Sequence, residues 1–493
     1  MVHLKEELHL PPNKLGTRHV QSLLLFLGMA IAYALRVCMS VAIVAMRNKA
    51  SANPDFPEYD WDSNQSSLIL SSFFWGYVIT QVPSGQLAST NSARKLLAFG
   101  IGLSSLLNML VPLLAGYGYI YLISLRVAMG LCQGCLLPCV QTLLSRWVPP
   151  LERARLGSFV MNGPQFGTVV TMPVSGLLAA SGIGWPSIFY IFGAFGVAWS
   201  ALMFCMGADH PSEHPRINPK EALYINNSLG NLDKAVDAEK PKVPWLSIIT
   251  SVPMWALIIV HCGHNWGFYT LLTEMPSYMK SVLKFDITQS GGISALPYLA
   301  MWLLGFPISY LSDFALRKGL TIVAVRKISN TIGLWIPAAA MIVLCVVVTT
   351  DKVILVAILV VAVGFNCGIT CGFQINHIDL SPNFAGPMMS ITNGLANILG
   401  IVAPLICGAI VNKDEGDVNL WHIVFYITAA IYFVTNLVFV IFGKAEIQSW
   451  NDQGGEARTR TGRVSVISIT GEPTSVSIPD RIKEEEANGS TRC

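Results

Sequence analysis

Hydrophobic positions along the chain fall into long runs that are separated by shorter polar stretches. A helix that crosses a bilayer needs about 20 predominantly apolar residues. The pattern predicts twelve such helices, and the first of them is too long for a signal peptide and is followed by another span after a short loop. The predicted spans cover 22–46, 67–89, 97–115, 117–141, 157–181, 186–206, 252–274, 291–312, 329–349, 353–374, 387–411 and 421–443.

The longest polar break between spans is the Pro- and Lys-containing segment 207–250, which follows the sixth span. It predicts an N-terminal six-helix half at 22–206, a linker, and a C-terminal six-helix half at 251–443. Residues 1–21 form a short leading segment, and the polar, Ser/Thr-rich tail 444–493 is predicted to be disordered. The expected fold is therefore an all-α membrane protein of twelve transmembrane helices in two halves, which is typical of the major facilitator fold.

Charged residues are scarce, and their positions predict an orientation. Only 12% of the residues are charged, against about 25% in a typical soluble protein, which argues against a soluble enzyme or a nucleic-acid-binding protein. The first loop, roughly 47–66, is acidic. Basic residues concentrate on the other side, so both termini are expected to be cytoplasmic. These basic residues are Arg94, Lys95, Arg146, Arg153, Arg155, Arg317, Lys318, Arg326 and Lys327.

Two arginines fall within predicted spans, where a charge costs about 2.5–3.5 kcal/mol at the bilayer centre. Arg36 lies in AYALRVCMSVAIV and Arg126 in ISLRVAMGLCQGC, and no Asp or Glu lies at similar depth in the first six spans. A guanidinium group pairs well with carboxylate and phosphate oxygens. The pattern indicates a small anionic substrate, and the alternative is that each arginine bonds backbone carbonyls or extends to the interface.

Other polar residues in the spans are candidates for the same cavity. Tyr33 lies one turn before the first arginine, and Tyr77 and Tyr269 lie in spans two and seven. Their hydroxyl groups would orient a substrate, although tyrosines in membrane proteins also serve in packing and at interfaces. His264 would bind substrate, carry a proton or play a structural role. Glu274, near the end of span seven, is a candidate coupling residue or a solvated residue at the outer gate.

Several kinds of chemistry are not expected from this sequence. Ten of the eleven cysteines lie in predicted spans, so reduced packing residues are expected rather than disulfides or a metal site. The sequence contains no GxxxxGK[ST] loop and no assembled nucleophile–base pair, which argues against an ATP-driven pump, an enzyme or a bound cofactor. Asn64 begins the sequon Asn-Gln-Ser in a predicted outside loop and is a candidate for glycosylation.

Several segments resemble one transporter family over about residues 20 to 450. It is the organic anion and sodium–phosphate cotransporter branch of the major facilitator superfamily, which includes sialin and the vesicular glutamate transporters. Within it, the sequence most resembles insect proteins labelled as inorganic phosphate cotransporters. The segments are AYALRVCMSVAIV, SSFFWGYVITQVPSGQLA, RWVPPLERARLGSF, HNWGFYTLLTEMPSYMK, GFQINHIDLSPNFAGPMMSITNGLA and FYITAAIYFVTNLVFVIFGKAEIQSW.

The resemblance implies a role for each matching polar residue. Arg36 matches the first-helix arginine that binds the substrate anion in this family. Arg126 matches the fourth-helix arginine of the binding and coupling network. Tyr77 and Tyr269 match cavity tyrosines, and Asn393 in SITNGLA matches a polar position that lines the C-terminal half of the cavity.

The sequence departs from the family at residues that matter for coupling. Gln133 stands where proton-coupled relatives carry a glutamate, and glutamine does not titrate. Gln141 replaces a family histidine, and Leu70 replaces the second-helix histidine of the vesicular glutamate carriers. Their seventh-helix arginine aligns with His264. Sodium is therefore slightly favoured as the coupling cation, and facilitated diffusion or a proton site at His264 or Glu274 remains open.

The predicted function is secondary transport of inorganic phosphate or organic carboxylates by alternating access. A proton-coupled, sialin-like carrier of organic anions is the alternative within this class. The alternative from another class is a transport-inactive receptor or scaffold on the same fold. The expected partners are a small anion and the lipid bilayer, without nucleic acid. The protein is expected to function as a monomer in the plasma membrane or in an endolysosomal or vesicle membrane.

Overall fold

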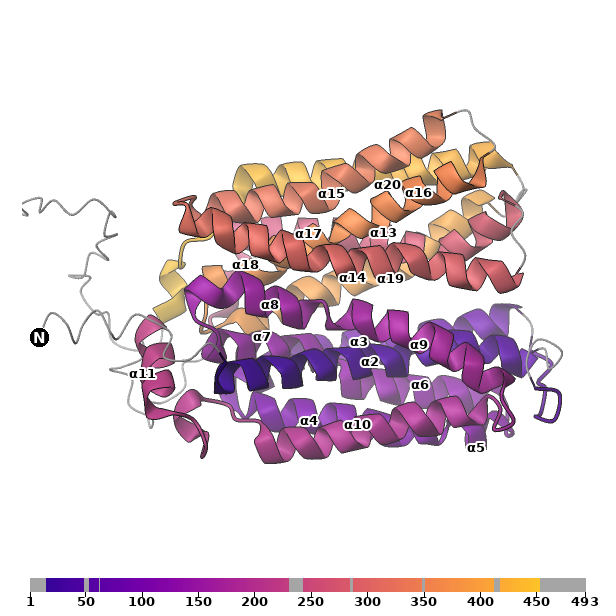
Figure 1. Cartoon of the computed structure of the whole chain (residues 1–493), viewed down its shortest axis with the longest axis horizontal. Coiled ribbons are helices and arrows are strands. Elements are labelled where there is room, and N and C mark those ends of the chain that lie inside the picture. The colour runs from indigo at the N-terminus through magenta and orange to yellow at the C-terminus, as the bar shows by residue number, and fades with distance from the viewer. Residues whose placement is uncertain are drawn as a thin grey trace, which may run out of the picture. The chain divides into compact units, whose positions relative to one another are not determined.

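The structure is a computed structural model that describes residues 15–47, 53–61, 63–229, 243–283, 287–347, 351–411 and 417–452. These residues form helices joined by short connections, and none of them is assigned to a strand (Figure 1). Each of the twelve predicted spans corresponds to helix in this part of the chain. Within these described ranges, eight helical stretches are long and apolar enough to cross a membrane by length and composition. The other four predicted spans are interrupted, short or less apolar helices.

Short interruptions divide several spans of the N-terminal half. A new short helix begins after Leu110 with Pro112 in its first turn, and another begins after Asn162 with Pro164 in its first turn. Proline is favoured in a first helical turn because its missing N–H has no partner to lose there. The helices are α2 (Thr17–Arg47), α3 (Ser63–Thr90), α4 (Ala93–Met109), α5 (Val111–Ala115), α6 (Tyr119–Gln133), α7 (Leu136–Trp147), α8 (Arg153–Met161), α9 (Gly163–Ala180) and α10 (Pro186–Met206). The connection to the second half contains α11 (Pro219–Ser228) and α12 (Trp245–Ile249).

The C-terminal half corrects two predicted boundaries. The tenth span does not end near residue 374, because the chain bends at Gly372 and continues as helix to Leu380. Helix α15 begins at Ile322, where Thr321 accepts a hydrogen bond from the Ala324 backbone N–H, so Arg326 is helical rather than part of a loop. The helices are α13 (Val252–Ser281), α14 (Ile287–Arg317), α15 (Ile322–Val346), α16 (Lys352–Gly364), α17 (Gly368–Cys371), α18 (Phe373–Leu380), α19 (Ala385–Val411) and α20 (Val418–Phe442).

Glycines let helices of the N-terminal half approach closely. A Cβ atom on Gly130 of α6 would collide with the backbone oxygen of Phe73 on α3, and one on Gly76 would collide with the backbone oxygen of Val127. Small residues at such crossings bring the two backbones into contact. The close approach of α3 and α6 places Arg126 beside Phe73.

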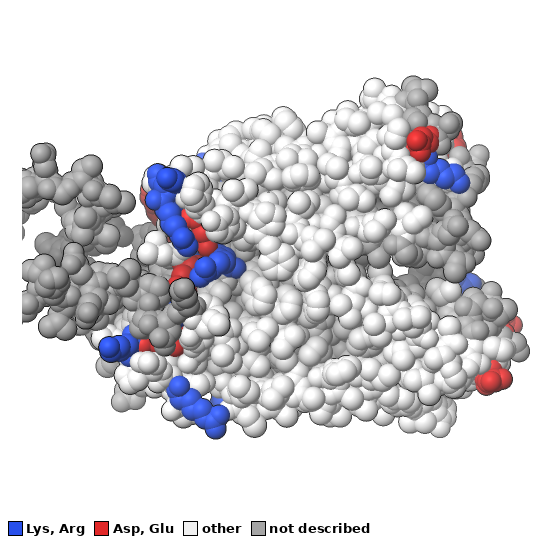
Figure 2. All heavy atoms as spheres, viewed as in Figure 1, with Lys and Arg blue, Asp and Glu red and all other residues white. Residues whose placement is uncertain are grey.

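Charged side chains lie mainly at the ends of the helices. In Figure 2 the middle of the visible face is almost free of them, and Lys and Arg gather near the end where α8 and α11 lie in Figure 1. We call this the basic end, defined by Arg94, Arg146, Arg153 and Arg317. Ion pairs among the described residues lie at this end. Arg18 at the start of α2 pairs with Glu152 at 2.7 Å and with Glu221 of α11 at 2.9 Å, which attaches the linker helix to the N-terminal half.

Candidate functional site

The guanidinium group of Arg36 is enclosed by aromatic rings. Its Cζ atom lies 4.6 Å from the ring centroids of Tyr33 and Phe73 and 4.8 Å from that of Tyr77. Phe74 adds a fourth ring at 5.4 Å. Aromatic faces attract a cation but provide no counter-charge. Nε and Nη2 of Arg36 are buried without a hydrogen-bond partner among the described residues, and this edge matches the two oxygens of a carboxylate or phosphate.

Arg126 provides a second buried cation next to the first. Its Cζ atom lies 5.1 Å from the centroid of the Phe73 ring, the same ring that Arg36 contacts. Its Nε and Nη1 atoms are also buried and unpartnered within the described part of the chain. The ion pairs found among those residues involve neither arginine. Among the described residues, the structure thus brings together two cations that have no protein carboxylate between them.

The C-terminal half reaches the same place through α13 and α19. Asn393 donates a hydrogen bond from Nδ2 to the Tyr77 hydroxyl oxygen at 3.1 Å, which links the two halves. The Tyr269 ring lies 5.5 Å from that of Phe74, and its hydroxyl donates to Asn397 at 3.2 Å. The predicted residues Tyr33, Tyr77, Tyr269 and Asn393 therefore surround or adjoin Arg36.

Three residues of this site were not predicted: Phe73, Phe74 and Asn397. The two phenylalanines belong to the apolar string SSFFWGY, in which hydropathy alone cannot separate residues that face lipid from those that face a cation. Asn397 follows Asn393 by one helical turn, and this i, i+4 spacing was the available signal.

His264 and Gln133 contact other residues than Arg36. His264 packs against Phe268 at 5.5 Å and Phe373 at 5.8 Å between ring centroids, and its buried Nδ1 has no partner among the described residues. Gln133 lies two turns after Arg126 on α6 and donates from Nε2 to the Ser104 hydroxyl at 2.9 Å. Neither side chain has a described contact with Arg36.

Two other predicted residues can be placed only by their helices. Glu274 lies in α13, and Asn64 lies in the first turn of α3. Their side chains are outside the described part of the structure. The predictions of a coupling role for Glu274 and of glycosylation at Asn64 therefore stay predictions.

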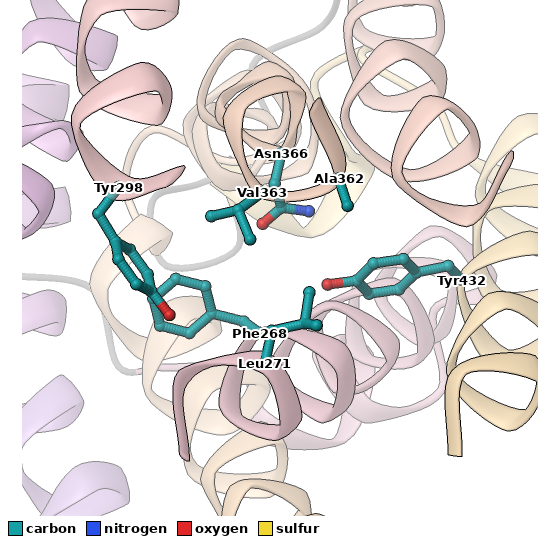
Figure 3. Close-up of a pocket in the computed structure, with 7 residues that line it drawn as sticks. All are labelled: Phe268, Leu271, Tyr298, Ala362, Val363, Asn366 and Tyr432. Carbon is teal, nitrogen blue, oxygen red and sulfur yellow. The ribbon is translucent and has the colours of Figure 1, made fainter. Parts of the chain in front are cut away.

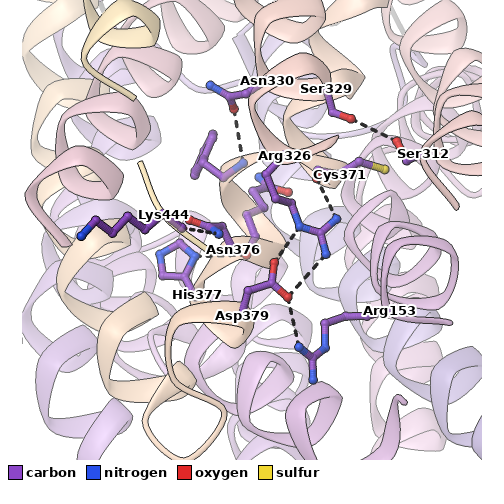
Figure 4. Close-up of polar contacts among 12 residues, drawn as sticks. Arg153, Ser312, Arg326, Ser329, Asn330, Cys371, Asn376, His377, Asp379 and Lys444 are labelled. Atoms are coloured by element: carbon purple, nitrogen blue, oxygen red, sulfur yellow. Dashed lines mark hydrogen bonds and ion pairs between the residues drawn. The ribbon is translucent and has the colours of Figure 1, made fainter. Parts of the chain in front are cut away.

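An ionic bridge joins the halves at the basic end (Figure 4). Asp379 of α18 accepts from Arg153 of the N-terminal half at 3.0 Å and from Arg326 of α15 at 2.6 Å. Nearby, the hydroxyl groups of Ser158 and Ser309 also meet across the halves. The described conformation is thus closed at the basic end. The sequence interpretation missed Asp379 because it placed this residue in a loop.

A small cavity inside the C-terminal half is not the anion site. Its empty volume is about 180 Å³. None of the predicted site residues lines it. The lining residues are Phe268, Leu271, Tyr298, Ala362, Val363, Asn366 and Tyr432 (Figure 3).

Relatives of known sequence cover most of the chain. A Drosophila ananassae protein named "Putative inorganic phosphate cotransporter" is 42% identical over 453 residues, which cover 87% of this chain and 93% of its own length. Human sialin is 37% identical, with coverage of 89% and 92%. Human vesicular glutamate transporter 2 is 34% identical, with coverage of 91% and 78%.

Solved structures agree with the fold. The proton:xylose symporter bound to 6-bromo-6-deoxy-D-glucose matches with a TM-score of 0.64 at 15% identity, covering 86% of this chain and 95% of the symporter. The Escherichia coli fucose:proton symporter matches with a TM-score of 0.59 at 11% identity, covering 85% and 98%. At such low identity these matches establish the fold alone.

The family follows from these matches. Residues 25–404 match the Major Facilitator Superfamily, which is a family of transporters rather than enzymes. The helical structure, the similar structures and the relatives together confirm the predicted fold and a multi-pass membrane protein. The chain belongs to the major facilitator superfamily, in the branch that contains inorganic phosphate cotransporters, sialin and the vesicular glutamate transporters.

Proposed function

We propose that this protein carries a small anion across a membrane by alternating access, with the anion bound between Arg36 and Arg126. The observation that carries the proposal is the pair of buried guanidinium groups, neither of which has a carboxylate partner within the part of the chain that the structure describes. A buried charge without a partner is strongly unfavourable. A bound anion would supply the missing counter-charge and accept the unpartnered N–H groups.

The proposed substrates are inorganic phosphate and organic carboxylates. Both present oxygens that fit the free edge of a guanidinium group. The names of the relatives favour the same classes, since they include a phosphate cotransporter, sialin and a glutamate transporter. Tyr77, Tyr269 and Asn393 would orient the anion from both halves, because each lies against Arg36 or against a residue that encloses it.

The transport is proposed to be coupled to a cation, with sodium slightly favoured. Gln133 supports this preference, because its amide cannot replace the titratable glutamate of proton-coupled relatives. Proton coupling in the manner of a sialin-like organic anion carrier is the alternative. His264 is a candidate for its proton site, since it is buried and has one unpartnered ring nitrogen among the described residues.

The basic end is proposed to face the cytoplasm, by the positive-inside rule. Both termini would then be cytoplasmic, and Asn64 would face the opposite side, where glycosylation takes place. We propose the plasma membrane or that of a vesicle or endolysosome as the location. We also propose that the protein functions as a monomer, which is supported by the origin of both arginines and the residues around them in one chain.

Uptake by proteoliposomes tests the proposal. The protein would be supplied in turn with radiolabelled phosphate, sialate, glutamate, urate and aromatic anions, with sodium and proton gradients imposed separately. We expect uptake of at least one anion above that of empty liposomes. Uptake that is unchanged without sodium but driven by a pH gradient would overturn the preference for sodium.

The same assay separates a transporter from a receptor or scaffold on this fold. Arg36→Ala should abolish anion uptake, because it removes the main ion pair. A correctly folded wild-type protein that moves none of these anions, while retaining a cellular effect that Arg36→Ala does not change, would favour the receptor or scaffold.

A further inference from the structure

His377 of α18 lies at a polar junction between the two halves. Its side chain is fully buried, and Nδ1 lies 3.1 Å from the Gln374 carbonyl oxygen. The same carbonyl accepts a hydrogen bond from Nε2 of Gln141, on α7 of the N-terminal half, at 3.0 Å. On the other side of the ring, Nε2 lies 2.9 Å from the hydroxyl oxygen of Thr392 on α19. The imidazole thus bonds to Gln374 and Thr392 of its own half, and the Gln374 carbonyl also bonds to Gln141 of the other half.

These partners suit both protonation states of the imidazole. A carbonyl oxygen only accepts hydrogen bonds, so Nδ1 carries a hydrogen in either state. In the neutral ring, Nε2 accepts from the Thr392 hydroxyl. In the cationic ring, Nε2–H donates to Thr392, whose hydroxyl turns to the Met389 carbonyl oxygen at 3.3 Å. A proton can therefore join the Nε2 lone pair with only a hydroxyl rotation.

The junction lies on the same short helix as the ionic bridge at the basic end. Asp379, two residues after His377, holds Arg153 of one half beside Arg326 of the other (Figure 4). The His261 ring lies 6.4 Å from that of His377 between centroids. The titratable and charged groups that the described residues place near His377 are His261 of α13 and Asp379 of its own helix, with Arg153 and Arg326 attached to Asp379. Lys444 also lies here, where its backbone oxygen accepts from Asn376 (Figure 4).

A proton on His377 would weaken this closed arrangement. His377 is fully buried, and burial away from water disfavours the charged form of an imidazole. Separating the halves lets water solvate the imidazolium group. Because proton binding and opening favour each other, acid shifts the population toward the conformation that is open at the basic end.

We propose that His377 is a proton-binding residue that controls opening at the basic end. The proposal rests on the proposed alternating access, and it holds whether sodium or a proton drives uptake. His377 acts as a positioning residue, because it does not touch the anion site and acts through α18. At neutral pH the ring is uncharged and the bridge is closed, and at acid pH the charged ring favours the open state.

The test measures separation of the halves without any substrate. Bio-orthogonal spin labels at Leu151 and Leu320, which are exposed at the basic end of the two halves, report the distance between them. Measurements at about pH 7.5 and about pH 4 are needed, because burial away from water moves the titration of a histidine below its ordinary range. We expect the population with the longer separation to rise several-fold in the wild type at the lower pH, and not in His377→Gln.

Controls separate titration from misfolding. His422→Gln changes a histidine on α20 outside the junction and should respond to pH as the wild type does. Thr392→Val keeps the histidine but removes the acceptor for Nε2–H, so its transition should need a lower pH. If His377→Gln fails to fold, the transition pH of Thr392→Val is used instead. A lower transition pH than in the wild type supports the proposal, and an unchanged one contradicts it.

A wild-type response in His377→Gln, a wild-type transition in Thr392→Val or a wild-type protein without any pH response would each overturn the proposal. The distance readout is independent of the uptake panel. A pH-dependent opening without anion uptake would refute the proposed function and leave the role of His377 standing.

Discussion

Arg36 differs from the arginines of the basic end in the chemistry that surrounds it. Arg18, Arg153 and Arg326 each pair with a carboxylate. Arg36 instead meets the faces of aromatic rings, and two of its N–H-bearing nitrogens are unpartnered within the described residues. The aromatic rings keep water away and so strengthen the attraction of the guanidinium for a bound anion.

Tyr77 connects this cation to the opposite half, and its hydroxyl can be tested alone. Tyr77→Phe keeps the ring over Arg36 but removes the oxygen that accepts from Asn393. Losing one hydrogen bond of this kind costs about 0.5–1.5 kcal/mol. We expect roughly a 2- to 12-fold loss in anion uptake at low substrate concentration, with little change in melting temperature. Unchanged uptake would exclude a role for the hydroxyl in the transport cycle.

At the scale of helices, the crossing of α3 and α6 determines where Phe73 and Arg126 meet. Gly130→Ala would place a methyl group against the Phe73 backbone oxygen. Such overpacking costs about 1–3 kcal/mol and would shift α3 away from α6. We expect a lower melting temperature in detergent and weaker anion uptake.

Gly176→Ala provides the matched control for this crossing. Gly176 lies inside α9, and an added Cβ atom there would have no other atom within 4 Å. Alanine favours helix more than glycine does, so this variant should be as stable as the wild type or slightly more stable. Equal effects of the two substitutions would show that the crossing of α3 and α6 is not tightly packed.

Hydropathy predicted the helices well but not their ends. The apolar runs are long enough to identify each span, because the bilayer sets their length. The segment from Phe373 to Leu380 mixes polar residues with apolar ones, so its pattern looked like a loop. It is helical and buried at the basic end, where the other half supplies Arg153 as a partner for Asp379. A partner so distant in sequence leaves no local signal.

For the whole molecule, the closed basic end predicts a specific cross-link. Ser158 and Ser309 meet across the halves through their hydroxyl groups. Cysteines at both positions, in a Cys371→Ser background because Cys371 lies 3.5 Å from Ser309, should form a disulfide under mild oxidation. The bond would hold the halves together, so uptake should stop and return after reduction.

The single variant Ser158→Cys in the same background should keep its uptake during oxidation. Disulfide formation without loss of uptake would contradict the rocking of the two halves, because the locked conformation would then still transport.

The charged residues of the site could be predicted from the sequence, whereas their aromatic neighbours could not. Arg36 and Arg126 were evident because charge is rare in a bilayer. Their shared neighbour Phe73 was not, since its role depends on how α3 crosses two other helices. The sequence also did not determine which residues His264 contacts. The structure places it against Phe268 and Phe373 rather than against either arginine.

The central claim is that Arg36 holds the transported anion, and exchange across proteoliposomes tests it most directly. Exchange of labelled for unlabelled anion needs binding and alternating access but no driving gradient. Arg36→Lys keeps the positive charge but loses the bidentate edge, and Arg47→Lys makes the same change at the exposed end of α2. We expect exchange to fall at least tenfold in Arg36→Lys and to stay at the wild-type rate in Arg47→Lys. Wild-type exchange by correctly folded Arg36→Lys would contradict the account.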